Sequence, residues 1–135
     1  MTDWRARIWG PAVLLLSSAA SMALEIIAGR ALAPYVGMSL YTWTTIIAVV
    51  LTGLTLGHWI GGRAADRAAA PARLTGLILI AAAGLSAASL PLLRFAAPMA
   101  DGADPLMRIG TLSMAAFFLP SLAAGTLSPI LTKMA

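Results

Sequence analysis

The feature that most constrains this chain is an uncharged stretch that runs from Trp43 to Gly62, just before a basic segment. Its length of about twenty residues is enough for an α-helix to cross a bilayer. Glycines recur four residues apart within it, at Gly53, Gly57 and Gly61. Residues at that spacing share one helical face, and glycines there let a second backbone approach closely. The stretch therefore predicts a membrane helix packed against a neighbour, and we expect the first helix of the chain to be that neighbour.

The composition of the whole chain is typical of a membrane protein. Of its 135 residues, 60% are hydrophobic and 10% are charged, whereas a soluble domain has about 25% charged residues. A soluble, alanine-rich helical bundle is the alternative. The sequence disfavours it because the charges stand at the ends of the apolar runs instead of following one face of each helix. We therefore expect an all-α integral membrane protein in contact with the lipid bilayer.

The charged and ligating residues disfavour several classes of function. The net charge is +4, but the basic residues flank apolar runs, as do residues that set membrane topology beside anionic headgroups. Nucleic acid is therefore not expected as a partner. The chain has no cysteine, which rules out thiol chemistry on its own residues. With one histidine and five acidic residues, we expect no metal site and no cofactor.

Four apolar runs predict four membrane spans in a single domain, residues 1–135. The spans are expected at about 8–30, 44–62, 74–93 and 109–131, with short loops between them. An even number of spans places both termini on one side. That side would hold six of the nine basic residues, Arg5, Arg7, Arg63, Arg67, Arg73 and Lys133, and the other side Arg30, Arg94 and Arg108. By the positive-inside rule, both termini are expected in the cytoplasm.

Prolines and glycines mark the expected breaks between and within these spans. Residues 31–42, which contain a proline and a glycine, are predicted to form an interfacial linker. Residues 63–73 are predicted to form a polar loop. Pro91 is expected to bend or end the third helix. Pro120 is expected to kink the fourth and to leave carbonyl groups for a neighbouring helix to satisfy.

The fourth run carries a second stripe of small residues. Ser121 and Gly125 stand four residues apart, a spacing that predicts a face for close helix packing. Before this run, Asp101 and Asp104 lie in a loop that also contains glycine and proline. Carboxylates in such a loop are typical turn formers, and we expect that role for both of them.

Glu25 is the only acidic residue inside an apolar run, and it is the main candidate for a functional site. Ser17, Ser21 and Gly29 share its four-residue spacing, so this face is expected to turn away from lipid. An ionisable group inside a membrane is costly; it either serves function or joins helices through hydrogen bonds, and both interpretations stay open. Arg30 is rotated by roughly 140° from Glu25 on a continuous helix. It is either a binding residue or, more simply, a residue at the headgroup level.

Aromatic residues and one histidine complete the candidate set. Tyr35, Tyr41 and Trp43 fit an aromatic belt at the membrane interface; the alternative is that they stack on a cation bound near Glu25. His58 lies about 21 Å along the second helix. That depth is near the opposite leaflet from Glu25, so the two groups are expected not to touch. His58 is either a proton-relay residue or a hydrogen-bonded structural one.

Two segments resemble a known family. They are Leu24-Glu25-Ile26, Gly29-Arg30, Pro34-Tyr35, Gly37, Ser39, Trp43 and Leu51 to Arg67, and the fourth-run sequence FFLPSLAAGTLSPILTKMA. The pattern resembles the N-terminal membrane region of bacterial spermidine-synthase-like membrane proteins, in which a major-facilitator-like membrane part is fused to an aminopropyltransferase-like domain. The resemblance implies a bundle similar to part of a major-facilitator half, placed in the bacterial inner membrane.

One motif links this resemblance to the major facilitator superfamily, which carries G-x-x-x-D-R-x-G-R between its second and third helices. Gly62, Asp66 and Arg67 match the first part, while alanines stand at the later glycine and arginine positions. The resemblance implies that this motif, with Arg63 inside it, braces helix ends on the cytoplasmic side. The alternatives are that Asp66 caps the start of the third helix or that the segment only anchors the chain by its positive charge.

The function follows from the membrane class together with the resemblance. The chain lacks the strand, glycine-rich loop and helix of a nucleoside-binding domain, so we expect no catalytic residues and no enzyme. It is either a stand-alone membrane module or a piece of a longer protein. We expect a transport-like module for a small cationic solute such as a polyamine, working as a homo-oligomer because four helices are few for a transport path. The alternative is a non-transporting anchor or assembly subunit for a separate synthase-like or other partner chain.

Overall fold

The computed structural model describes residues 3–67 and 69–134, and within these ranges every element is a helix. Helix α1 spans Asp3–Val36, α2 spans Leu40–Arg67 and α3 spans Pro71–Met99. Helix α4 (Pro105–Ser113), a π-helical turn η1 (Met114–Phe118) and α5 (Leu119–Met134) follow one another without a loop and form a fourth long helix. Four helices are thus long and apolar enough to cross a membrane, which confirms the predicted all-α class with four spans.

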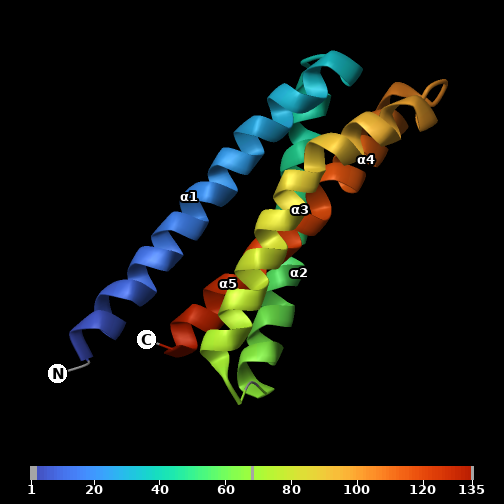
Figure 1. The fold of residues 1–135 in the computed structure, drawn as a ribbon. Coiled ribbons are helices and arrows are strands. Elements are labelled where there is room, and N and C mark those ends of the chain that lie inside the picture. The colour runs from blue at the N-terminus through green and yellow to red at the C-terminus, as the bar shows by residue number, and fades with distance from the viewer. Residues whose placement is uncertain (1–2, 68, 135) are drawn as a thin grey trace.

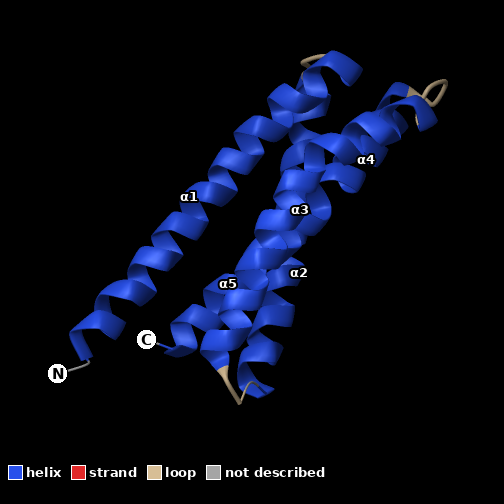
Figure 2. Ribbon diagram, in the orientation of Figure 1, coloured by secondary structure: helices blue, strands red, loops and turns tan. Residues whose placement is uncertain are grey.

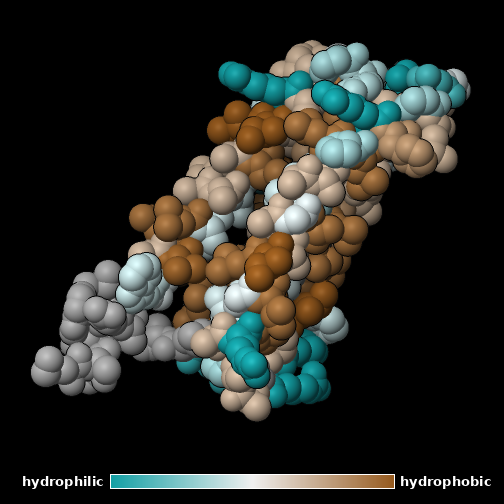
Figure 3. All heavy atoms as spheres, viewed as in Figure 1, coloured by the Kyte–Doolittle hydropathy of each residue, from teal (hydrophilic) through white to brown (hydrophobic). Residues whose placement is uncertain are grey.

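The helices run alternately up and down, so that both termini and the α2–α3 connection lie at one end of the bundle (Figure 1). The two short turns at the other end leave little chain outside the helices (Figure 2). Hydrophilic side chains gather at the two ends in the space-filling view, and hydrophobic side chains cover the length between them (Figure 3). This distribution is that of a multi-pass membrane protein. The side chains of Arg5 and Arg7 lie outside the described residues.

The connection between α1 and α2 is much shorter than the predicted linker at 31–42. Helix α1 continues through Pro34 to Val36, and only residues 37–39 are non-helical. Gly37 turns the chain with a positive φ of 75°, which favours glycine. Ser39 then caps α2 by accepting the backbone N–H of Thr42 at 3.1 Å. The long-linker prediction was wrong because a proline near a helix end removes only one backbone hydrogen bond.

The polar loop predicted at 63–73 is also wrong, and of the two predictions for Pro91, a bend or an end of the third helix, the end is wrong. Helix α2 runs to Arg67, and α3 starts at Pro71. Proline suits the first position of a helix, since its missing N–H would be unpaired there anyway. Helix α3 then passes through Pro91 to Met99. The loss of one backbone hydrogen bond does not end a long helix of the membrane type.

The expected distortion at Pro120 takes the form of a π-bulge. The π-turn Met114–Phe118 lies directly before this proline, whose ring crowds the carbonyl of Ala116 four residues earlier. A π-turn widens the backbone at this point. The hydroxyl of Ser121 donates to the Phe117 carbonyl at 2.7 Å. This bond lies within the same helix and does not involve the Ala116 carbonyl, so the predicted contact of a freed carbonyl with a neighbouring helix stays a prediction.

The glycine stripe of α2 packs against α5 and not against α1. A methyl group added to Gly57 would overlap the Leu122 carbonyl oxygen and lie 2.9 Å from the Cα of Gly125. One added to Gly61 would lie 2.7 Å from the Cα of Thr126. The expectation that the first helix receives this stripe was therefore wrong. The small-residue stripe of the fourth span is its partner, since two faces without side chains allow the closest backbone approach.

Helix α1 packs against the bundle through its C-terminal half. Ala28 and Leu32 are fully buried in the hydrophobic core, and the indole ring of Trp43 covers Gly29. Between Leu15 and Ala23, by contrast, most side chains of α1 are exposed or half-buried. In Figure 1 the helix diverges from the others toward the N-terminus. This divergence opens the space in which the candidate site lies.

Candidate functional site

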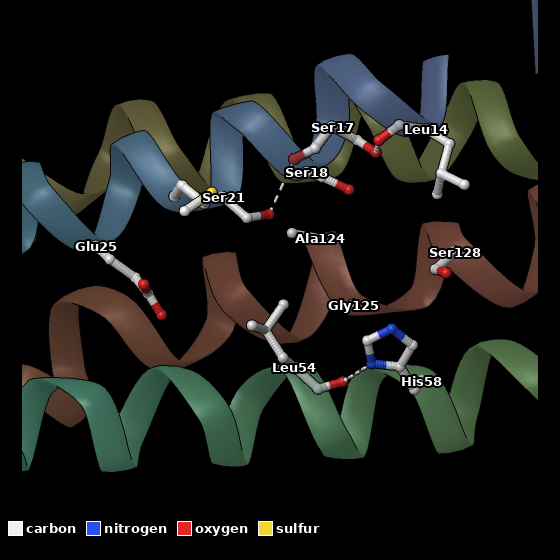
Figure 4. A pocket seen from close by; sticks show the side chains of 11 residues that line it. Leu14, Ser17, Ser18, Ser21, Glu25, Leu54, His58, Ala124, Gly125 and Ser128 are labelled. Carbon is white, nitrogen blue, oxygen red and sulfur yellow. Dashed lines mark hydrogen bonds between the residues drawn. The ribbon is translucent and has the colours of Figure 1, made fainter. Parts of the chain in front are cut away.

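A groove with a volume of about 240 Å³ lies between α1, α2 and α5 (Figure 4). Helix α1 contributes its four-residue stripe, Ser17, Ser21 and Glu25. The stripe thus faces α2 and α5, as expected of a face that turns away from lipid. The other lining residues are Leu14, Ser18, Met22, Leu54, His58, Ala124, Gly125 and Ser128.

The carboxylate of Glu25 has no partner within the described part of the chain. Glu25 is half-buried, and no hydrogen bond or ion pair to it occurs among the described residues. In Figure 4 its side chain points from α1 across the groove toward α5. A carboxylate that joins helices would need a donor on a neighbouring helix, and none contacts Glu25 within the described structure.

The serines beside Glu25 use their hydrogens within α1. Ser17 Oγ donates to the Leu14 carbonyl at 2.9 Å, and Ser21 Oγ donates to the Ser17 carbonyl at 3.0 Å. A hydroxyl group has one donor hydrogen and two acceptor lone pairs. Both hydroxyl oxygens therefore keep lone pairs that can accept a hydrogen bond from a molecule in the groove.

His58 approaches the same groove from α2. Its Nδ1 lies 2.7 Å from the Leu54 carbonyl oxygen; because a carbonyl only accepts, Nδ1 carries the proton, and Nε2 of the neutral ring is an acceptor. Figure 4 shows His58 and Glu25 toward opposite ends of the groove. No hydrogen bond or ion pair joins them in the described structure. That they share one groove was not predicted, because it depends on how far α1 stands from α2.

The other candidates on α1 and α2 lie outside this groove. Arg30 is exposed and makes no ion pair with Glu25 in the described structure. Trp43 covers Gly29, Tyr35 packs against the hydrophobic core and Tyr41 is 68% exposed. None of these aromatic rings lines the Glu25 groove, so the structure gives no support to cation stacking near Glu25. Their common position at one end of the bundle fits the belt interpretation.

The motif residues Gly62, Arg63, Asp66 and Arg67 occupy the last turns of α2. Lys133 Nζ of α5 donates to the Ala65 carbonyl at 2.8 Å and to Asp66 Oδ1 at 3.3 Å. Asp66 does not cap α3, whose N-cap is Ala70 with no side-chain hydrogen bond. The end of α2 is thus tied to the end of α5. No local sequence pattern predicts this contact, which joins residues 67 positions apart.

Three other charged residues or pairs make structural contacts. The guanidinium of Arg63 stacks over the Trp59 ring, 3.7 Å from its centroid. Asp101 forms an ion pair of 2.8 Å with Arg108. Asp104 caps α4 by accepting the N–H of Leu106 at 3.0 Å, which confirms its predicted role at a turn.

A second groove on the other side of α1 was missed by the sequence analysis. It has a volume of about 510 Å³, lies between α1, α3 and α5, and is lined mainly by alanine, leucine and serine residues. Ser17, Ser21 and Ala124 line both grooves. No cluster of three His, Asp or Glu residues that could hold a metal ion occurs in residues 3–67 and 69–134.

Comparison of the chain with protein-family models, with curated proteins and with solved structures finds no significant match in any of the three. The resemblance to spermidine-synthase-like membrane proteins therefore stays a prediction that rests on the residues quoted for it.

Proposed function

We propose that the chain is a transport-like membrane module that binds a small organic cation in the groove between α1, α2 and α5. The observation that carries this proposal is the Glu25 carboxylate, which faces the groove without a partner in the described structure. An ionisable residue within a membrane span is by default a functional group. The family resemblance adds a polyamine as one example of the solute, and a bacterial inner membrane as its place.

The polar groups around Glu25 support a cation as the ligand. Ser17 and Ser21 offer oxygen lone pairs, and Nε2 of His58 offers one when the ring is neutral. One carboxylate with several lone pairs beside it is complementary to an ammonium group, which has donors only. An anion would meet a like charge there.

We further propose that both termini face the cytoplasm and that the module works as a homo-oligomer. Four exposed basic side chains, Arg63, Arg67, Arg73 and Lys133, belong to the helix ends on the side of the termini. The positive-inside rule then assigns that side. Alternating access needs two halves that move against each other, and one bundle of four spans supplies a single half.

The proposal is tested by uptake of labelled amines into proteoliposomes. Glu25→Gln keeps the size of the side chain and removes its charge, so we expect a loss of uptake of at least about 100-fold, since a charged partner contributes a few kcal/mol. Asp101→Asn removes a carboxylate in the turn between α3 and α4, away from the groove, and serves as the control. Uptake that is unchanged in Glu25→Gln, or absent from the parent protein, would contradict the proposal.

A non-transporting anchor is the second candidate, and the exposed basic end of the bundle favours it. Arg67 and Arg73 are exposed, and neither makes an ion pair in the described structure. They are therefore free to hold an acidic surface of a cytosolic enzyme such as a synthase-like chain. Co-purification decides between the two candidates: a stable partner chain favours the anchor, whereas a homogeneous homo-oligomer favours the transport-like module.

A further inference from the structure

We infer that the solute is an amphipathic amine, with one ammonium group at Glu25 and a hydrocarbon stem in the groove between α1 and α3. This inference rests on the proposed function and specifies its substrate class. It predicts that a singly charged alkylamine binds better than a polyamine.

The two grooves border each other between α1 and α5. Ser17 and Ser21 of α1 and Ala124 of α5 line both of them. Glu25 stands one helical turn beyond Ser21, and its neighbours Leu24 and Ile27 line the larger groove. A single molecule can therefore reach the carboxylate from one side of α1 while the rest of it lies on the other side.

The larger groove suits a hydrocarbon stem. Its walls come from small and apolar side chains, among them Ala20, Ala83 and Phe117. Among its polar residues, Ser89 already donates to the Leu85 carbonyl at 3.2 Å. Its volume of about 510 Å³ lies in the range of roughly 300–1,000 Å³ that is usual for small-molecule sites. Figure 3 shows the face between α1 and α3 as hollowed and bordered by hydrophobic side chains.

The charges exclude a second ammonium group from this groove. No Asp or Glu lines it, and Glu25 is the one carboxylate on the smaller groove. A second positive charge would have to leave water without a counter-charge, which is strongly unfavourable. A polyamine carries charges along its whole length, whereas an alkylamine carries one at its end. Charge complementarity therefore selects the single-headed ligand.

Equilibrium dialysis of labelled amines against the protein in lipid nanodiscs tests this inference, with empty nanodiscs as the blank for partition into lipid. Butylamine, octylamine and spermidine are the probes. After subtraction of the blank, we expect octylamine to bind at least about tenfold more tightly than butylamine, because its additional methylene groups are buried. Spermidine should bind no more tightly than butylamine.

Two variants on opposite walls of the larger groove test binding of the hydrocarbon stem separately from binding of the ammonium group. Ala83→Phe on α3 and Ala20→Phe on α1 fill the groove at positions that are exposed in the absence of ligand, so the fold should tolerate them. Both should reduce octylamine binding to the butylamine level and leave butylamine binding unchanged. Ala87→Phe is the matched control, because Ala87 is exposed on α3 outside both grooves.

The outcomes distinguish this inference from the proposed function. Suppose that Glu25→Gln abolishes binding of every amine but that the parent protein binds spermidine as tightly as octylamine. The cation site then stands, and the inference of an amphipathic ligand is wrong. The same holds if both phenylalanine variants bind octylamine as the parent does. If octanol or octyl sulfate displaces octylamine equally well, the groove takes acyl chains regardless of charge, and the inference is wrong. If Glu25→Gln binds all amines normally, both the inference and the proposed function fail.

Discussion

Helices α2 and α5 approach each other until their backbones touch, whereas α1 contacts the bundle through one half and stands away from it through the other. In the first pair, glycines replace side chains along a face of three helical turns. At α1, buried Ala28 and Leu32 hold one half, and two grooves flank the remainder. The comparison separates a rigid packing unit from an element with room to bind a ligand and to move.

The location of polar groups follows the same division. At Gly57 the atoms nearest to an added Cβ are backbone atoms of Leu122 and Gly125, so the contact itself leaves no room for a solute. Helix α1 carries the carboxylate of Glu25 on its bundle-facing side, where no described residue pairs with it. Glu25 is an energetically costly group at a loosely packed position, and the tightly packed α2–α5 pair beside it supplies stability. This arrangement is expected where function is favoured over packing.

The largest effect is expected from a methyl group added between α2 and α5. Gly57→Ala places a Cβ against the Leu122 carbonyl and the Cα of Gly125. We expect a destabilisation of about 3 kcal/mol, as for overpacking against backbone that cannot move aside. Thermal or denaturant unfolding in detergent micelles measures it.

The matched control for this substitution lies on the same helix. Gly62 has no atom within 4 Å of an added Cβ, so Gly62→Ala should be neutral or stabilising by up to about 1 kcal/mol through helix propensity. Equal effects of the two substitutions would show that α2 and α5 do not pack through the stripe.

The second test loosens the attached half of α1. Trp43 is 37% exposed, and its ring covers Gly29. Trp43→Ala should therefore cost about 2 kcal/mol, less than a fully buried aromatic residue. Hydrogen exchange should become faster in α1 and stay unchanged in the α2–α5 pair. Faster exchange in α5 as well would mean that α1 is part of the rigid unit.

The third test concerns the stability cost of the site. Because Glu25 has no partner among the described residues, Glu25→Gln should raise the free energy of unfolding by about 1 kcal/mol while it removes amine binding. Asp101→Asn should lower stability slightly, since Asp101 is paired with Arg108. A loss of stability in Glu25→Gln would reverse the assignment and make Glu25 a contact between helices.

The sequence was sufficient for features that depend on local pattern. Run length and charge placement predicted four helices, and the four-residue spacing of Ser17, Ser21 and Glu25 predicted the face of α1 that turns inward. The glycine stripe showed that some backbone approaches α2 closely. It could not show which one, because small residues at this spacing on α5 and on α1 carry the same signal, and the choice depends on how whole helices fit.

Features that join distant residues were beyond the sequence analysis. The larger groove exists because α1 diverges on the N-terminal side of its contact at Gly29, and no local pattern encodes that angle. The sequence predicted a kink at Pro120, but it did not predict the π-turn that precedes this proline. The prolines at 34 and 91 were overestimated as helix ends, since a long apolar helix in a membrane gains more from its remaining hydrogen bonds than one proline removes.

The smallest effect is expected at the end of the α2–α5 pair, where Lys133 of α5 contacts α2. Lys133→Met removes the hydrogen bond to the Ala65 carbonyl and the ion pair with Asp66. It should cost about 0.5–1 kcal/mol, because Lys133 and Asp66 are 48% and 80% exposed and exposed pairs contribute little. Asp66→Asn removes the ion pair alone, and its cost should vanish at high salt. Arg67→Met is the charge-matched control. If Lys133→Met and Arg67→Met have the same effect, the tie adds nothing to the pair, and the glycine stripe alone holds α2 to α5.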